Sequence, residues 1–222
     1  MNVAYLPNGE GPRLAYRLRP GASPTILFLP GYASDMDGAK AVALDAFAAE
    51  HGLAMLRFDY SGTGLSDGDF ADGTLDRWIE EALHVADVVT QGPLILVGSS
   101  MGSWIALHVA LRRPERLVAL LGIAAAPDFT EWGDRIGLSE AFIQSGQSNL
   151  LLNSDIIVEC PVRLVHGDKD ADVPLVIALD LLERLRSADV QLTIIKDGGH
   201  RLSEPHEIRA ILRTVAALLE TS

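Results

Sequence analysis

The chain of 222 residues contains a single cysteine, Cys160, which excludes an internal disulfide and a zinc site built from cysteines. Cys160 precedes Pro161 at the start of an apolar run, and this setting predicts a buried structural thiol. No run approaches the roughly 18 apolar residues that a membrane-spanning helix needs. We therefore expect no stable insertion into a membrane.

Basic residues are also scarce, because 18 lysines and arginines stand against 30 aspartates and glutamates, a net charge of −12. An acidic surface repels phosphate, which argues against nucleic acid or an anionic membrane surface as a partner. The N-terminal segment MNVAYLPNGEGPRL has neither the apolar core of a secretory signal nor the Arg-rich pattern of a transit peptide. The expected location is therefore the cytoplasm.

The remaining composition is that of an ordinary soluble globule, with 48% hydrophobic and 22% charged residues. No internal repeat, low-complexity segment or Pro/Gly/Ser linker divides the chain. A length of this order fits one domain. We therefore expect a single domain over residues 1–222.

Strand-length apolar runs alternate with helix-length segments along the chain. The expected strands cover residues 25–30, 53–58, 93–98, 117–123, 161–166 and 190–196, and the expected helices cover 37–51, 74–90, 100–113, 174–187 and 204–220. This order is typical of a parallel sheet with helices on both faces. The alternation of Leu14, Tyr16 and Leu18 predicts an antiparallel hairpin at its edge. The predicted fold class is α/β, doubly wound.

Residues 127–159 interrupt this alternation, since they carry no strand signal. A connection this long in a compact domain is usually functional. The segment mixes aromatic and apolar side chains (Phe129, Trp132, Phe142 and Ile143) with polar residues and glycines. This mixture predicts a small helical cap or lid inserted into the domain.

The segment Gly98–Gly102 has the pattern G-x-S-x-G, with Ser100 at its centre. An apolar strand precedes it and a helix follows, and this context gives the short pattern its specificity. A serine in such a strand-helix turn is exposed at the end of the strand, and the N-terminus of the following helix favours developing negative charge. The pattern therefore predicts a serine nucleophile, with the N–H of Met101 as one donor to the oxyanion.

A serine nucleophile needs a base and an acid that orients the base, in the chain order serine, acid, histidine. His200 lies in the Gly-flanked loop after the last expected strand, where it can approach Ser100. His51, His84 and His108 fall within helices, and His206 begins one. His166 precedes an acidic loop and is interpreted as a support for that loop. His200 is therefore the predicted base.

Cofactor and metal signals are missing from the sequence. There is no H-E-x-x-H and no cluster of histidines and acids with metal-ligand spacing. The segment DYSGTGLSDG lacks the G-K-[ST] ending of a phosphate loop, and it is interpreted as a tight turn beside the active-site crevice. We expect neither a metal nor a cofactor.

The G-x-S-x-G segment, the HGDKDADVP loop at 166–174 and the GGH loop at 198–200 together resemble the α/β-hydrolase superfamily over nearly the whole chain. In that superfamily the acid of the pattern H-G-x-x-D-x-x-V-P orients the histidine, and this resemblance implies that role for Asp170. Asp168 and Asp172 are the competing acids in the same loop. Asp128 is a further alternative, since some hydrolases place the acid after the preceding strand.

Four separated segments are similar to one subgroup of that superfamily, the palmitoyl-protein thioesterases and acyl-glucuronide esterases with their bacterial relatives. They are LPGYASDMDGAKA (29–41), RFDYSGTGLSDG (57–68), ILVGSSMGSW (95–104) and the pair at 200–201. The resemblance implies a second oxyanion donor in the N–H of Tyr32, with Gly31 letting the backbone turn toward Ser100. Trp104, Phe129, Trp132 and Phe142 are the residues that we expect to form the acyl wall.

The expected function is hydrolysis of acyl thioesters or carboxylic esters through an acyl-enzyme, on a small-molecule or an acylated-protein substrate. Three alternatives stay open: a small-molecule carboxylesterase or acyl-glucuronide esterase, a C–C bond hydrolase on the same scaffold, and a non-catalytic binding protein. Serine at position 100 argues against the dehalogenases and epoxide hydrolases of the superfamily, which place aspartate there.

Overall fold

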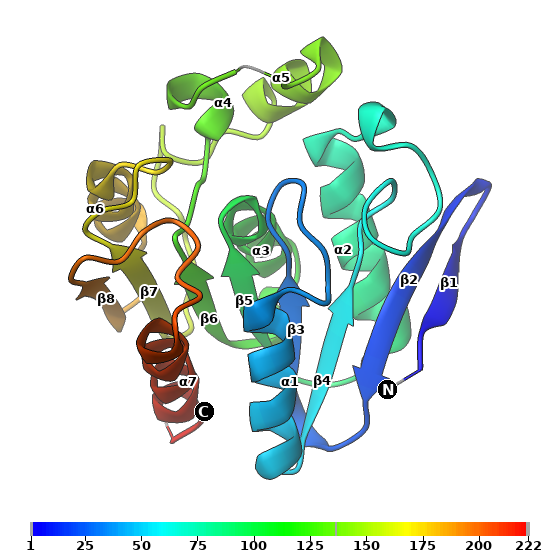
Figure 1. Ribbon diagram of the computed structural model, residues 1–222, viewed down its shortest axis with the longest axis horizontal. Coiled ribbons are helices and arrows are strands. Elements are labelled where there is room, and N and C mark those ends of the chain that lie inside the picture. Colours follow the sequence, from blue (N-terminus) through cyan, green and yellow to red (C-terminus); the bar gives the residue numbers. More distant parts are fainter. Residues whose placement is uncertain (1, 136, 221–222) are drawn as a thin grey trace.

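The computed structural model describes residues 2–135 and 137–220, and its strands form one sheet (Figure 1). The spatial order is β1-β2-β4-β3-β5-β6-β7-β8. The strands are β1 (Ala4–Asn8), β2 (Gly11–Arg19), β3 (Ala22–Leu29), β4 (Leu53–Phe58), β5 (Leu94–Ser99), β6 (Leu117–Ile123), β7 (Val162–Gly167) and β8 (Val190–Ile195). Strands β3 to β8 are parallel to one another. The predicted α/β fold is confirmed.

The helices occupy the segments that the sequence predicts for them. They are α1 (Ala39–Glu50), α2 (Leu75–Val89), α3 (Met101–Arg112), α4 (Phe129–Trp132), α5 (Glu140–Gln147), α6 (Leu175–Arg184) and α7 (Pro205–Glu220), with short 3₁₀ helices at Phe70–Asp72 and Pro114–Arg116. The expected edge hairpin is β1 with β2, which pairs antiparallel to β4. Strand β8 forms the other edge, where its residues alternate between half-buried and exposed positions.

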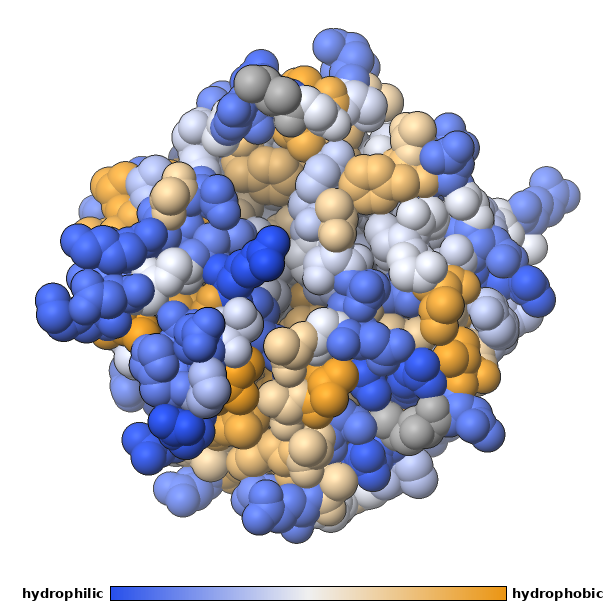
Figure 2. All heavy atoms as spheres, viewed as in Figure 1, coloured by the Kyte–Doolittle hydropathy of each residue, from blue (hydrophilic) through white to orange (hydrophobic). Residues whose placement is uncertain are grey.

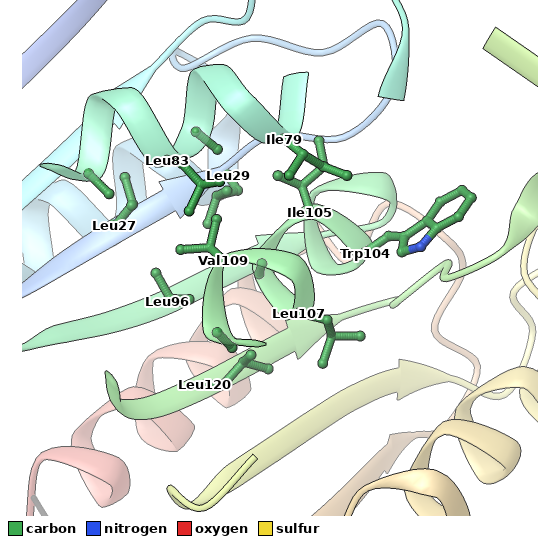
Figure 3. Close-up of a cluster of buried hydrophobic side chains, with 14 of the residues drawn as sticks. Leu27, Leu29, Ile79, Leu83, Leu96, Trp104, Ile105, Leu107, Val109 and Leu120 are labelled. Carbon is green, nitrogen blue, oxygen red and sulfur yellow. The ribbon is translucent and has the colours of Figure 1, made fainter. Parts of the chain in front are cut away.

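Helices cover both faces of the sheet. Alternate residues of each central strand point to opposite faces, so each strand contributes to two separate clusters. On β3, Ile26 and Phe28 pack in the cluster that contains α1 and α7. Leu27 and Leu29 pack in the cluster that contains α2, α3 and α6. Figure 3 shows the second cluster, in which α3 lies across the sheet with Ile105 and Val109 directed toward the strands and α2. Each fully buried leucine contributes roughly 1.5–3 kcal/mol of transfer free energy.

The strand order reverses between β3 and β5. From β3 the chain passes through α1 to β4 on one side, and from β5 it passes through α3 to β6 on the other. Ligands of open α/β sheets bind at the carboxyl ends of the strands beside such a reversal. In Figure 1 the segment with α4 and α5 lies beyond these same strand ends.

The structure also bears on the single cysteine and on membrane-spanning helices. Cys160 is buried, as predicted, and this burial raises the pKa of its thiol to about 11. Within residues 2–135 and 137–220, no helix combines the length and the apolar character that a membrane crossing requires.

Candidate active site

The turn between β5 and α3 places Ser100 at the reversal of the strand order. Its backbone is strained, with φ 54° and ψ −122°, a conformation that costs about 1–3 kcal/mol. A Cβ on Gly98 would lie 2.5 Å from the Gly102 carbonyl oxygen, and one on Gly102 would lie 2.0 Å from that of Leu29. Real side chains do not approach so closely, so both positions require glycine. This close packing explains the G-x-S-x-G pattern.

His200 and Asp170 meet Ser100 from two separate loops. His200 Nε2 lies 3.0 Å from Ser100 Oγ, and His200 Nδ1 lies 2.9 Å from Asp170 Oδ2. The Asp170 side chain is fully buried, whereas that of His200 is 22% exposed. The three side chains thus form a chain of hydrogen bonds that leads from a buried carboxylate to an accessible hydroxyl.

The Asp170 carboxylate is held in its ionised form. Burial raises its pKa, but the hydrogen bond to His200, the main-chain N–H groups of Val173 and Asp172, and the charge of His200 together bring the pKa below its usual value. Oδ1 accepts both N–H groups, at 2.8 Å and 2.9 Å. An ionised carboxylate accepts from His200 Nδ1–H, which leaves Nε2 free to accept the Ser100 proton.

Main-chain hydrogen bonds fix the Asp170 loop against the His200 loop. Lys169 N–H donates to Gly198 O at 2.9 Å, and Asp197 N–H donates to Asp168 Oδ1 at 2.5 Å. Asp168, a competing acid in the sequence, therefore binds the loop that contains His200 through the main chain of Asp197. His166 Nε2 donates to Val173 O at 2.9 Å, which fits the supporting role expected for it.

Asp128, the other alternative acid, has a different set of contacts. It is 4% exposed and has φ 57°. Its carboxylate accepts the N–H groups of Leu151 and Leu152, at 2.9 Å and 2.7 Å. Burial raises the pKa of Asp128. This carboxylate therefore ties the start of the 127–159 segment to Leu151 and Leu152, while Asp170 is the acid that contacts His200.

The loop after β3 runs directly beside Ser100. A Cβ on Gly31 would lie 3.3 Å from Ser100 Cβ and 3.9 Å from its Oγ. Tyr32 follows Gly31, and Met101 is the first residue of α3, so its N–H has no partner within the helix. Asp59 supports this loop by accepting the N–H of Met36 at 2.7 Å. The sites predicted for the two oxyanion donors therefore lie on the two segments that flank Ser100.

A cavity of about 450 Å³ opens beside Ser100. Its wall comes from the loop after β3, the first turn of α1, the Ser100 turn and the residues after His200. It is lined by Phe28, Gly31, Tyr32, Ala33, Ser34, Asp35, Gly38, Ala39, Lys40, Ala41, Ser99, Ser100, His200, Arg201 and Ser203. Figure 2 shows this face hollowed near its centre, with hydrophilic residues on one side and hydrophobic residues below α4 and α5 on the other.

The four aromatic residues expected in the acyl wall do not line this cavity. Trp104 is fully buried, and its indole N–H donates to Asn149 O at 2.9 Å. Phe142 is also buried, with its ring centroid 5.2 Å from that of Tyr32. Phe142 therefore lies behind Tyr32 and Trp104 packs against Phe129, and neither ring lies in the wall.

Phe129 and Trp132 are the half-buried members of that set. The Phe129 ring lies edge-on to Tyr32 at 6.1 Å and to Trp104 at 5.7 Å. The Trp132 indole N–H donates to Pro127 O at 2.8 Å. These side chains belong to α4, and an acyl-wall role for them stays a prediction.

Lys40 and Arg201 are lining residues to which the sequence pattern assigns no role. The signal that could have indicated them is their position: Arg201 directly follows the predicted base, and Lys40 is one of only three lysines in the chain. A lysine within the first turn of the helix after β3 is bound to lie near the carboxyl ends of the strands.

One group of ligand-type side chains gathers within 4.8 Å in the described part of the chain: Asp170, Asp172 and His200. Two of these residues are hydrogen-bonded to each other, since the Asp170 carboxylate accepts from His200 Nδ1. The other ring nitrogen of His200 contacts Ser100 Oγ. The chemistry that this arrangement supports is proton transfer from a serine hydroxyl.

Comparison with known proteins supports the same interpretation. The family described as serine aminopeptidase S33 matches residues 21–134. The mitochondrial palmitoyl-protein thioesterase ABHD10 of mouse is 39% identical over 99% of this chain and 83% of its own length, and the human protein is 37% identical over 99% and 80%.

Solved structures agree with the sequence matches. The mouse α/β hydrolase domain-containing protein 10 superposes with a TM-score of 0.95 at 38% identity, covering 99% of both chains. A structure from Agrobacterium vitis S4 has a TM-score of 0.90 at 37% identity, covering 98% of this chain and 97% of its own.

The expected cytoplasmic location is wrong by this comparison, because the thioesterase relatives are mitochondrial proteins. The expectation was based on the missing leader pattern in the N-terminal residues. The similarity to the relatives lies in the folded domain, and the folded domain does not determine the cellular location. The family match, the full-length relatives and the shared fold lead to one conclusion: the chain belongs to the α/β-hydrolase family and is a serine hydrolase.

Proposed function

We propose that the protein hydrolyses acyl thioesters and related carboxylic esters, with Ser100, His200 and Asp170 as its catalytic residues. The observation that supports this proposal most directly is the pair of hydrogen bonds made by His200, at 3.0 Å to Ser100 Oγ and 2.9 Å to Asp170 Oδ2. The thioesterase name of relatives that align with nearly the whole chain supports the acyl thioester as substrate.

In the first half of the reaction, Ser100 Oγ attacks the acyl carbonyl carbon while His200 Nε2 takes the hydroxyl proton. The Asp170 carboxylate holds the ring and stabilises the imidazolium. The tetrahedral intermediate then collapses, the bond to the leaving sulfur or oxygen breaks, and His200 returns its proton to that atom. In the second half, water attacks the acyl-enzyme by the same route, which releases the acid and restores Ser100.

The negative charge of the intermediate needs preorganised donors. The N–H groups of Tyr32 and Met101 are proposed for this role, because their segments flank Ser100 and because main-chain donors need no rearrangement. Removal of one such donor typically lowers kcat by about 10²–10³-fold. The positive end of α3 adds to this stabilisation.

The acyl group is assigned to the aromatic side of the site. We infer that residues 127–159 form a cap on the single domain of residues 1–222. Phe129, which is edge-on to Tyr32, and Trp132 on the same short helix are proposed to offer an apolar surface. Trp104 packs against Phe129, and Phe142 packs against Tyr32. Each methylene that this surface covers is worth about 0.8 kcal/mol.

The test is kcat/KM for matched thioesters and oxygen esters from acetyl to palmitoyl, in the native protein and in Ser100→Ala. We expect thioester hydrolysis that falls at least about 10³-fold in the variant. A native-like rate in Ser100→Ala, or no hydrolysis of any thioester or ester by the native protein, would overturn the proposal. Faster turnover of a vinylogous diketone than of any ester would favour C–C bond hydrolysis instead.

A further inference from the structure

The charge in the wall of the cavity beside Ser100 is opposite to that of the chain. The net charge of the chain is −12, yet the wall contains Lys40 and Arg201 against a single carboxylate, Asp35. Among the residues that the structure describes, neither basic group has a carboxylate oxygen within 4.0 Å. Two cations that form no ion pair within this distance therefore line the same cavity as Ser100.

A hydrogen bond holds the Lys40 ammonium in place. The Lys40 ammonium donates to the main-chain oxygen of Arg201, which joins the first turn of α1 to the loop that contains His200. Lys40 is half-buried. Burial lowers its pKa, Glu207 raises it, and Arg201 lowers it. A bound anion would replace the solvent that Lys40 loses on burial, while Arg201 stays exposed at the mouth of the cavity.

The acidic side chain in the wall does not cancel this charge. Asp35 is exposed, and its Oδ1 accepts the N–H of Asp37 at 2.9 Å. The first turn of α1 adds positive potential to the same wall, since it contains no acidic residue and its Gly38 cap supplies no side-chain acceptor. The cavity as a whole is suited to negative charge.

The direction of the cavity decides which part of a substrate occupies it. In the proposed mechanism His200 gives its proton to the leaving atom, so the leaving group must lie on the His200 side of Ser100. Arg201 is the next residue along the chain, and Arg201 and Lys40 line the cavity on that side. The aromatic rings of Phe129 and Phe142 lie beyond Tyr32.

We propose that Lys40 and Arg201 form a subsite for a leaving group that bears a carboxylate or phosphate a few bonds from the scissile sulfur or oxygen. The inference rests on the proposed function, because it assigns one end of the substrate of the same site. The reaction is unchanged: the acyl–sulfur bond breaks, Ser100 Oγ takes the acyl group, and the thiol leaves with the proton from His200. The two cations hold its anionic end throughout.

The test uses octanoyl thioesters that differ only in the thiol. The thiols are 3-mercaptopropionate, with a carboxylate, 2-mercaptoethyl phosphate, N-acetylcysteamine, which is neutral, and cysteamine, which is cationic. We expect kcat/KM to be at least about fivefold higher for an anionic thioester than for the neutral one, and lowest for the cationic one. The two anionic substrates distinguish a carboxylate from a phosphate as the preferred group.

Variants then assign the preference to the two residues. We expect the anionic-to-neutral ratio to fall about fivefold in Arg201→Gln and to approach one in the Lys40→Gln, Arg201→Gln double variant. Arg201→Glu should reverse the preference toward the cysteamine thioester. The matched control is Arg213→Gln, an exposed arginine on α7 that lies outside the cavity and has the same change in net charge; it should leave the ratio unchanged. A rise in salt should also reduce the ratio.

Two results would overturn the inference while leaving the proposed function intact. One is equal kcat/KM for anionic and neutral thioesters in the native protein. The other is a ratio that survives in the double variant, or that falls as much in Arg213→Gln. If none of the thioesters is hydrolysed, the proposed function itself fails.

Discussion

The indole N–H of Trp104 donates to the main-chain oxygen of Asn149 at 2.9 Å, and His108 Nε2 lies 3.0 Å from the same oxygen. These contacts join α3, the helix that begins at the Ser100 turn, to Asn149 in the 127–159 segment. Asn149 in turn donates to Asp76 on α2 at 2.7 Å. The segment around Asn149 is thus anchored to both α3 and α2.

The first prediction concerns this anchor. Trp104→Phe removes the indole donor but keeps an aromatic ring against Phe129, so we expect a loss of about 1 kcal/mol in the free energy of unfolding. Urea unfolding measures this change. Trp132→Phe is the matched control, because its indole N–H bonds to Pro127 O from a half-buried position. An equal loss in both variants would contradict a special role for the Asn149 contact.

The second prediction is a dependence of stability on pH through His108. Burial lowers the pKa of His108 from 6.5 to about 4. Between these values the unfolded chain binds a proton that the folded chain does not, so stability is full above pH 6.5 and decreases as the pH falls toward 4. The expected decrease is about 3 kcal/mol.

Urea unfolding at pH 7 and pH 4.5 tests this contribution, with His108→Gln as comparison. The glutamine amide can still donate to Asn149 O, but it does not titrate. The variant should therefore lose less stability than the native protein on acidification. The same acid sensitivity in both proteins would show that His108 is not responsible.

The third prediction separates two glycines near the site. Gly102→Ala places a methyl group 2.0 Å from Leu29 O, and the backbone of β3 cannot move away, so we expect a loss of several kcal/mol in stability. Nothing lies within 4 Å of a Cβ on Gly199, so Gly199→Ala should stay within about 0.5 kcal/mol of the native protein. Thermal unfolding compares the two, and similar melting temperatures would refute the packing argument.

The fourth prediction concerns chain length. Phe129 is half-buried and edge-on to Tyr32, so Phe129→Ala should lower kcat/KM for palmitoyl thioesters about tenfold more than for acetyl thioesters. A series of thioesters from acetyl to palmitoyl measures this selectivity, and Trp132→Ala is expected to act in the same direction. A uniform decrease over all chain lengths would place the acyl group elsewhere.

The periodic part of the fold is predictable from the sequence because apolar runs and turns carry it locally. The strand that ends at Ser99 and the helix that starts at Met101 lie within one residue of their predicted bounds. The proximity of Ser100, Asp170 and His200 also follows, since each lies at the carboxyl end of a parallel strand and these ends meet at one edge. The exposed alternation of β8 could have been read from Gln191 and Thr193.

The surroundings of Ser100 are harder to predict. The sequence around an aromatic residue is the same whether its ring lines the acyl-binding site or packs behind it. Trp104, which is fully buried, could therefore not be distinguished from a ring exposed to the substrate. The cavity depends on how the start of α1 meets the loop after His200, a contact between residues 161 positions apart. That Lys40 and Arg201 line the same cavity could therefore not be predicted from either local segment.

The central claim is that His200 activates Ser100 as the nucleophile, and labelling with a fluorophosphonate followed by peptide mapping tests it most directly. We expect one labelled serine, Ser100, with no labelling in Ser100→Ala and labelling slowed at least about 10³-fold in His200→Gln. Labelling that persists in Ser100→Ala, or that proceeds at the native rate in His200→Gln, would contradict it.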